Sequence, residues 1–272
     1  MSRRLTRRFV ERRQQGRAAL IFYLAAGDPS IALAADMLHA VVAGGADIIE
    51  LGYPFCDPIL DGPVIRLANR RALDAGGSLD ATLAIVRRFR ARDADTPIVL
   101  MGYANPLLSR DGAVFAYIAD AGADALIIPD LPLREAAALL PAIAAAGLAL
   151  VPLVSPDGMT DANLAASPGV GGFSYCVAQA GPTGGAAPDT GQVRAAVAMC
   201  RALSDRPVAV GFGIKTPALA AEIAAVADGV IVGSALVDRI RAMGDEDVDA
   251  AALFAAIADF CRTFRTAIDG RS

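Results

Sequence analysis

Eight short apolar runs rich in β-branched residues recur along the chain, and this repetition restricts its possible folds more than any other feature. The runs do not alternate apolar and polar residues, so each is typical of a parallel strand that is covered on both faces. We predict strands at residues 20–24, 48–51, 98–101, 125–128, 149–153, 172–176, 208–210 and 229–232.

Segments of helical length separate most of these strands. We predict helices at residues 31–43, 78–91, 133–146, 190–203 and 217–226. Strands and helices that alternate in this way over 272 residues favour a closed (β/α)8 barrel over an open doubly wound sheet. No linker or change of composition divides the chain, so residues 1–272 are predicted to form a single barrel domain. Leu5 and Phe9, four residues apart, predict an extra N-terminal helix that covers one end of the barrel.

The scarcity of histidine and lysine excludes several kinds of catalytic chemistry. His39 is the only histidine, so a zinc site built from histidines cannot form, and no metal site is expected. A Ser-His-Asp triad would have to use His39, which lies in a run predicted to be helical. A Schiff-base enzyme would have to use Lys215, the only lysine.

Composition also argues against nucleic acid and membranes as partners. The net charge of −4 and the absence of Trp do not suit a surface that binds nucleic acid. The uncharged stretch at residues 136–154 could resemble a membrane span, but Pro141, Gly147 and Pro152 interrupt it. We therefore expect neither nucleic-acid binding nor a membrane span.

The cysteines and the N-terminus indicate a cytoplasmic protein. The four cysteines show no paired spacing and are interpreted as free thiols of a reducing compartment; they are Cys56, Cys176, Cys200 and Cys261. The basic N-terminal segment lacks the apolar run of a secretory signal.

Two carboxylates, Glu50 and Asp61, lie in or near the long loop that follows the second predicted strand. In (β/α)8 barrels the chemistry gathers at the carboxyl ends of the strands. Glu50 stands in the apolar run IIEL, where burial would raise its pKa towards the range of a proton shuttle. The alternatives are structural: Glu50 could end its strand in solvent, Asp61 could cap the next helix, and Asp57 could belong to a turn.

Glycine-rich loops after the last three strands indicate a phosphate site. Gly184 follows the sixth strand, Gly213 follows the seventh, and Gly233 and Ser234 follow the eighth. Glycines let backbone N–H groups approach a phosphate, and a helix that begins near Ser234 would add its N-terminal partial charge. The alternative is that these glycines only form tight turns.

Seven motifs give the chain a resemblance, over nearly its whole length, to the tryptophan synthase alpha chain family. They are ALIFYLAAGDP, GGADIIELGYPFCDPILDGPVI, LMGYANP, GADALIIPDLP, FSYCVAQAGPTG, GFGI and GSALV. The resemblance implies a (β/α)8 barrel that cleaves indole-3-glycerol phosphate to indole and D-glyceraldehyde 3-phosphate, a lyase step of L-tryptophan biosynthesis. It also implies an α2β2 tetramer with a beta chain that carries pyridoxal phosphate, and no cofactor in this chain.

The resemblance further implies roles for individual residues. Glu50 matches the family's catalytic acid/base, and Asp61 matches the carboxylate that faces the indole N–H. Thr183 matches the threonine that orients Asp61, and Tyr175 matches the tyrosine of the site motif. The residues that match the phosphate cradle are Gly184, Gly213, Gly233 and Ser234. The residues that match the apolar slot for the ring are Tyr23, Leu100, Ile127, Leu153, Phe212 and Ile231.

Several departures from the usual family residues lie in the loops after strands two and six. The departing residues are Phe22, Ala25, Cys56, Leu133, Gln179 and Pro182. Because these loops meet the beta chain in the family, two alternatives stay open: a free-standing lyase that releases indole, and a non-catalytic allosteric partner of a beta chain. The presence of both Glu50 and Asp61 favours a catalytic chain that acts with a beta chain.

Overall fold

The computed structural model of the chain describes residues 3–110, 113–154, 167–177, 189–211, 213–243 and 249–270. Every strand pairing in this part of the chain is parallel. The strands are β1 (Ala19–Ala25), β2 (Ile48–Gly52), β3 (Ile98–Met101), β4 (Ala125–Ile127), β5 (Ala149–Leu150), β6 (Leu153–Val154), β7 (Ser174–Val177), β8 (Val208–Gly211) and β9 (Gly229–Val232). Each predicted apolar run overlaps an observed strand, and the run at residues 149–153 is divided between β5 and β6.

The sheet closes into a barrel through the segment that joins β5 to β6. These two strands lie at the opposite ends of the strand order β5-β4-β3-β2-β1-β9-β8-β7-β6, yet only Val151 and Pro152 separate them in the chain. The Val151 N–H donates to the Leu126 carbonyl of β4 at 2.8 Å, and the Pro152 carbonyl accepts from the Tyr175 N–H of β7 at 2.9 Å. Proline has no N–H and interrupts the ladder. β5 and β6 therefore act as one strand of an eight-stranded parallel barrel, and the predicted (β/α)8 fold is confirmed.

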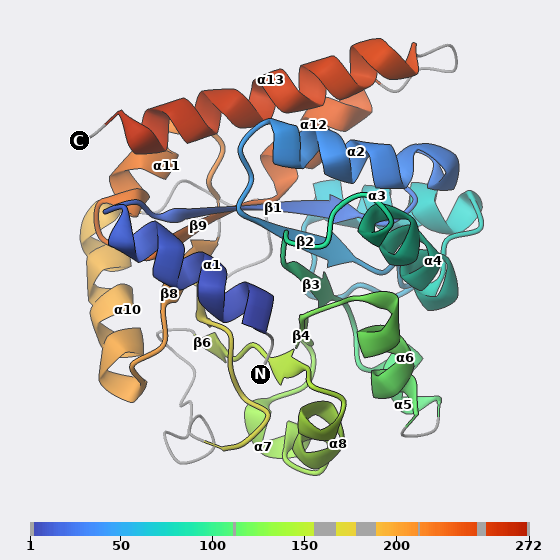
Figure 1. Cartoon of the computed structure of the whole chain (residues 1–272), viewed down its shortest axis with the longest axis horizontal. Coiled ribbons are helices and arrows are strands. Elements are labelled where there is room, and N and C mark those ends of the chain that lie inside the picture. Colours follow the sequence, from blue (N-terminus) through green and yellow to red (C-terminus); the bar gives the residue numbers. More distant parts are fainter. Residues whose placement is uncertain are drawn as a thin grey trace.

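Helices surround the barrel, as Figure 1 shows. They are α1 (Arg3–Gln14), α2 (Ile31–Ala43), α3 (Pro63–Asp74), α4 (Leu79–Arg90), α5 (Asn105–Leu108), α6 (Val114–Ala121), α7 (Leu133–Ala136), α8 (Leu140–Ala145), α10 (Thr190–Leu203), α11 (Pro217–Ala224), α12 (Ser234–Met243) and α13 (Ala250–Asp269). Serine hydroxyls cap two of them: Ser30 accepts from the Ala32 N–H before α2, and Ser78 accepts from the Ala81 N–H before α4.

The prediction of one helix over residues 133–146 was wrong, because this segment forms α7 and α8 with a turn between them. Pro141 lies in the first turn of α8. Inside a continuous helix, proline would remove one hydrogen bond and clash with the preceding turn, whereas the first turn tolerates it. The helix therefore ends at Ala136 and a new one begins at Leu140.

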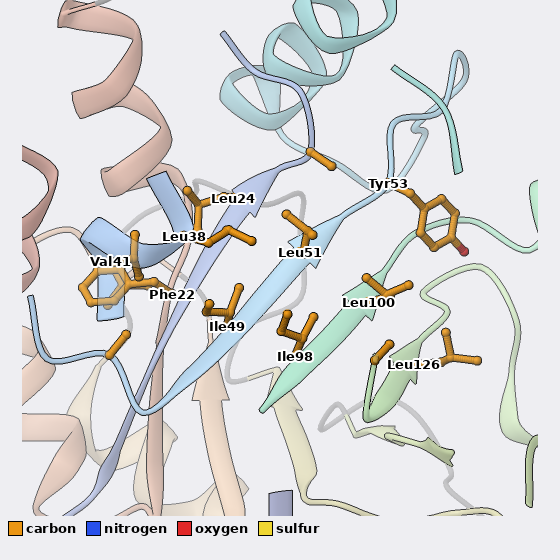
Figure 2. Close-up of a cluster of buried hydrophobic side chains, with 14 of the residues drawn as sticks. Phe22, Leu24, Leu38, Val41, Ile49, Leu51, Tyr53, Ile98, Leu100 and Leu126 are labelled. Carbon is orange, nitrogen blue, oxygen red and sulfur yellow. The ribbon is translucent and has the colours of Figure 1, made fainter. Parts of the chain in front are cut away.

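Side chains of the strands alternate between two apolar layers. The outer layer lies between strands and helices and includes Phe22, Ile49 and Leu126, which are labelled in Figure 2. The inner layer fills the barrel; its members from the strands and from the residues that adjoin them are Ala19, Ile21, Ile48, Val99, Ala125, Ile127, Ala149, Val151, Phe173, Ala209 and Ile231. Leu5 and Phe9 of α1 also belong to the inner layer. The expected N-terminal helix is thus present and covers the end of the barrel where the strands begin.

Ion pairs hold the arginine-rich helix α1 in place. Arg4 contacts Asp124 at 2.9 Å, and Arg12 contacts Asp47 at 2.8 Å. Asp47 also pairs with Arg265 of α13 at 3.0 Å, so one buried carboxylate joins both ends of the chain. In the part of the chain that the structure describes, no helix combines the length and apolar character needed to cross a membrane.

Candidate functional site

Glu50 is a buried acid on the inner face of the barrel. It lies on β2, level with Tyr23 of β1 and Val99 of β3, and only 2% of the residue is exposed. Its Oε2 atom is buried without a hydrogen-bond partner among the described residues. Burial, with a smaller contribution from the negative charge of Asp61, raises the pKa of Glu50 from 4.5 to about 8. At neutral pH Glu50 is therefore mostly a protonated acid, and the proposal that it ends its strand in solvent is wrong.

Asp61 lies in the loop between β2 and α3 and is also buried. Its Oδ2 accepts a hydrogen bond from Nδ2 of Asn69 at 3.1 Å. Burial raises the pKa of Asp61 to about 6, while the Asn69 hydrogen bond and the charge of Arg66 act in the opposite direction. Helix α3 begins at Pro63 with Gly62 as its N-cap, so Asp61 is not the helix cap that one sequence interpretation proposed.

Tyr103 holds the loop that carries Asp61. Its hydroxyl oxygen accepts the Leu60 N–H at 2.9 Å, and within the same loop the Asp61 N–H donates to the Pro58 carbonyl at 3.1 Å. Its own carbonyl accepts the hydroxyl of Tyr53 at 2.8 Å, and the ring of Phe55 stacks on its ring with centroids 5.3 Å apart. Tyr103 follows β3, so neighbouring strand ends cooperate to fix this loop. The sequence analysis did not identify Tyr103, although it lies inside the motif LMGYANP.

Tyr23 and Tyr175 face the same space as the two carboxylates. Burial raises the pKa of each tyrosine well above 10, and the charges of Glu50 and Asp61 raise both further. The Tyr23 hydroxyl lies where a Cβ on Gly52 would be, and the Tyr175 hydroxyl occupies the corresponding space at Gly211. The two glycines therefore make room for the tyrosine rings at the mouth of the barrel.

Besides Tyr23, three of the residues expected to line an apolar slot face inward. Ile127 and Ile231 belong to the inner layer, and Leu153 packs against it. Leu100 does not fit this expectation, because its side chain belongs to the outer layer, as Figure 2 shows. Strand side chains alternate between faces, so the inward neighbour is Met101, which packs against the inner layer.

Three of the four expected phosphate residues follow the carboxyl ends of the paired strands β8 and β9. Gly213 follows β8 with a φ of 66°, a conformation that glycine adopts without strain. Gly233 follows β9, and Ser234, which is buried, is the first residue of α12. The backbone N–H groups and partial positive charge of this helix start suit an anion. Thr183, Gly184 and Phe212 lie outside the described residues.

The outer surface of the loop after β2 is partly apolar. Ile59 is 67% exposed and Leu67 of α3 is 57% exposed, with Leu60 between them in the chain also exposed. Cys56 is exposed as well, and it lines a groove of about 440 Å³ together with Phe55, Pro58, Pro63, Arg66, Leu67, Arg70 and Leu73. We call Ile59, Leu60 and Leu67 the loop-two patch. Large apolar side chains at such exposure are typical of a protein contact.

Comparison with known proteins agrees with this geometry. The sequence profile of the family described as tryptophan synthase alpha chain matches residues 9–268. The tryptophan synthase alpha chain of Caulobacter sp. (strain K31) is 48% identical over 240 residues, covering 88% of this chain and 87% of the relative. That of Rhizorhabdus wittichii is 46% identical over 268 residues, covering 97% and 96%.

Solved structures agree with the fold of the whole chain. The crystal structure of tryptophan synthase subunit alpha from Legionella pneumophila str. Paris superposes with a TM-score of 0.89 at 35% identity, covering 99% of both chains. A chain of Mycobacterium tuberculosis tryptophan synthase gives 0.84 at 34% identity and covers 98% of this chain and 99% of that one.

Proposed function

Since the chain belongs to the tryptophan synthase alpha chain family, we propose that its barrel mouth cleaves indole-3-glycerol phosphate to indole and D-glyceraldehyde 3-phosphate. Enzymes of this family are lyases of L-tryptophan biosynthesis. The observation that supports the catalytic role most directly is Glu50, a buried acid with a pKa of about 8 and an unpartnered Oε2. A buried polar atom without a partner is costly for the fold, so a substrate group is the natural partner for it.

The two carboxylates are suited to different steps of a retro-aldol cleavage. Glu50, protonated at neutral pH, donates a proton to ring carbon C3, and positive charge then develops at the ring nitrogen N1. Asp61, mostly ionised at the same pH, stabilises that charge from its buried position before α3. Glu50, now a carboxylate, accepts the proton of the side-chain hydroxyl. The carbon–carbon bond breaks, its electrons return to the ring, and indole leaves with glyceraldehyde 3-phosphate. The ring itself accepts the electrons, so the proposed reaction uses no Schiff base and no cofactor in this chain.

The remaining residues position the substrate. Ile127, Leu153 and Ile231 offer apolar walls for the indole ring, and Tyr23 and Tyr175 border the same space. Gly213, Gly233 and Ser234 are proposed to hold the phosphate at the start of α12. From the family resemblance, Thr183, Gly184 and Phe212 are proposed to complete the site. An apolar slot with an anion site at one end matches the shape of the substrate.

The proposed partner is a tryptophan synthase beta chain in an α2β2 tetramer, in which pyridoxal phosphate belongs to the beta chain. The loop-two patch supports this proposal, because it exposes apolar side chains on the loop that also carries Asp61 and on α3, which follows this loop. A partner seated there would influence the position of Asp61 directly. The free-standing lyase is the alternative, and the two buried carboxylates argue against a non-catalytic role. A cytoplasmic location is proposed from the soluble biosynthetic family.

Turnover of indole-3-glycerol phosphate by the purified chain, measured by indole release, tests the proposal. The assay compares the wild-type chain with Glu50→Gln, each with and without a purified beta chain. Turnover that depends on Glu50 and increases with the beta chain supports both activity and partnership. Turnover that the beta chain leaves unchanged favours the free-standing lyase, and no turnover under either condition refutes the catalytic role.

A further inference from the structure

We propose that Asn69 is a positioning residue for the proposed reaction: its side-chain amide holds Oδ2 of Asp61 and leaves Oδ1 as the oxygen available to the substrate. This inference rests on the proposed function, because it assigns Asn69 a role through Asp61. Among the described residues the structure shows no hydrogen-bond partner for Oδ1.

The contact between Asn69 and Asp61 is sheltered from water. Asn69 is 4% exposed and Asp61 is 8% exposed, and Nδ2 lies 3.1 Å from Oδ2. A hydrogen bond from an amide to a carboxylate is stronger in such surroundings than in water, and its loss leaves a buried charge without its donor. Asn69 therefore has the right chemistry to fix both the orientation and the ionisation of Asp61.

Helix α3, which carries Asn69, is itself tightly held at the mouth of the barrel. Ile65 and Ala68 of this helix pack in one apolar cluster with Tyr23 of β1 and Val237 of α12. Near the end of α3, Arg71 donates two hydrogen bonds to Asp28, at 2.7 and 2.8 Å. Asp28 is buried in the loop after β1, so α3 is anchored to the strand that places Tyr23 beside Glu50. A rigid helix makes Asn69 a fixed donor.

Asp61 is thus held from two directions. The hydroxyl of Tyr103 accepts the N–H of Leu60, the residue before Asp61, while Asn69 donates to the Asp61 side chain. The two hydrogen bonds involve different elements: Tyr103 follows β3, and Asn69 lies on α3. Among the described residues Asn69 donates the one hydrogen bond to the carboxylate that the structure shows, and the charge of Arg66 also acts on it. Replacement of Asn69 is therefore expected to change the chemistry of Asp61 rather than the path of the loop.

Two variants of similar size separate positioning from packing. Asn69→Leu removes the donor, and Asn69→Asp keeps the shape but places a second carboxyl next to Asp61. The control is Thr82→Val on α4, which removes a buried hydrogen bond from Thr82 Oγ1 to the Ser78 carbonyl (2.8 Å) away from the site. The readouts are kcat and KM for indole-3-glycerol phosphate against pH, and a ¹³C NMR titration of the Asp61 carboxyl carbon in the free protein.

We expect Asn69→Leu to lower kcat about tenfold while KM changes less than about threefold, because the lost bond matters most when charge develops at N1. The Asp61 titration and the acidic limb of the rate profile should both move to higher pH, and further in Asn69→Asp, where two carboxyls repel. Thr82→Val should move neither. If Asn69→Leu does not fold, the Asn69→Asp titration decides the question.

An unchanged Asp61 titration and kcat in both Asn69 variants, or changes no larger than those of Thr82→Val, would overturn the positioning role. The NMR titration needs no turnover. A wild-type chain without activity would therefore refute the proposed function, while the titration would still decide whether Asn69 controls the Asp61 carboxylate.

Discussion

The buried Glu50 should lower the free energy of unfolding at neutral pH, and Glu50→Gln should raise it again. The folded-state pKa of about 8 lies above the ordinary value of 4.5, so the folded chain keeps a proton that the unfolded chain loses. The stability of the folded chain therefore falls as pH rises from about 4.5 to about 8, and the penalty stays constant above that range. Glutamine has nearly the same shape and does not ionise, so the variant avoids the penalty.

The size of this effect follows from the pKa difference at about 1.4 kcal/mol per pH unit. The penalty amounts to about 1 kcal/mol at pH 5 and about 3 kcal/mol at pH 7. Glu50 is only 2% exposed, so solvent screens little of this cost. Glu50→Gln should accordingly stabilise the chain by up to about 3 kcal/mol at pH 7 and by clearly less at pH 5. The same variant should lower turnover at least about a hundredfold, since the acid and base of the reaction are gone.

Urea unfolding of the wild type, Glu50→Gln and the control Glu135→Gln, each at pH 5 and pH 7, measures this prediction. Glu135 is exposed on α7, so its replacement should change stability little at either pH. If Glu50→Gln raises the free energy of unfolding by the same amount at both pH values, the Glu50 carboxyl does not ionise on unfolding as argued. A loss of stability at pH 7 would refute the desolvation of Glu50 altogether.

Three further predictions concern other parts of the site. Asp61→Ala should lower kcat by about two orders of magnitude, because the charge at N1 loses its partner; steady-state kinetics with an unchanged rate would contradict this role. Gly233→Ala should fold normally, since a Cβ there would lie 3.6 Å from the Tyr23 Cβ, but should raise KM; an unchanged KM and unchanged glycerol phosphate inhibition would argue against the phosphate cradle. Cys56 should react with an alkylating reagent before the three buried cysteines, and a beta chain should protect it; mass spectrometry that finds labelling unaffected by the beta chain would place the partner elsewhere.

The repeated apolar runs were sufficient to predict the barrel, because few other folds cover both faces of apolar strands that are separated by helices. Glu50 could be predicted for the same reason: a lone acid in an apolar strand near its carboxyl end is an unusual choice for packing. The division of residues 133–146 was less visible, although Pro141 carried the necessary signal. The alanine-rich composition around it concealed the break.

The sequence analysis missed residues that act from neighbouring elements. Asn69 carries no acid or base, and its contact with Asp61 depends on how α3 packs against the barrel. One signal was available: Asn69 lies four residues after Ile65, on the face of the helix that is buried. A polar side chain on a buried helix face is expected to have a hydrogen-bond partner. Leu100 was assigned to the slot because its position matches the family, although its side chain lies in the outer layer. Side chains alternate between the two faces of a strand, so the next residue, Met101, points inward instead.

Of the departing residues, Gln179 and Pro182 lie outside the described residues, while the places of Phe22, Ala25 and Cys56 show which of these three can matter for function. Phe22 points away from the site and packs edge-on against Phe264 of α13, with ring centroids 5.8 Å apart. Ala25 is buried in the apolar cluster that also holds Ile65 and Ala68 of α3. Cys56 alone among these three is exposed, and it lines the groove beside the loop-two patch. A change at Cys56 alters the surface offered to a partner without altering the buried acid chemistry. Differences between this chain and its relatives at these positions should therefore appear in the affinity for a beta chain before they appear in the intrinsic cleavage rate.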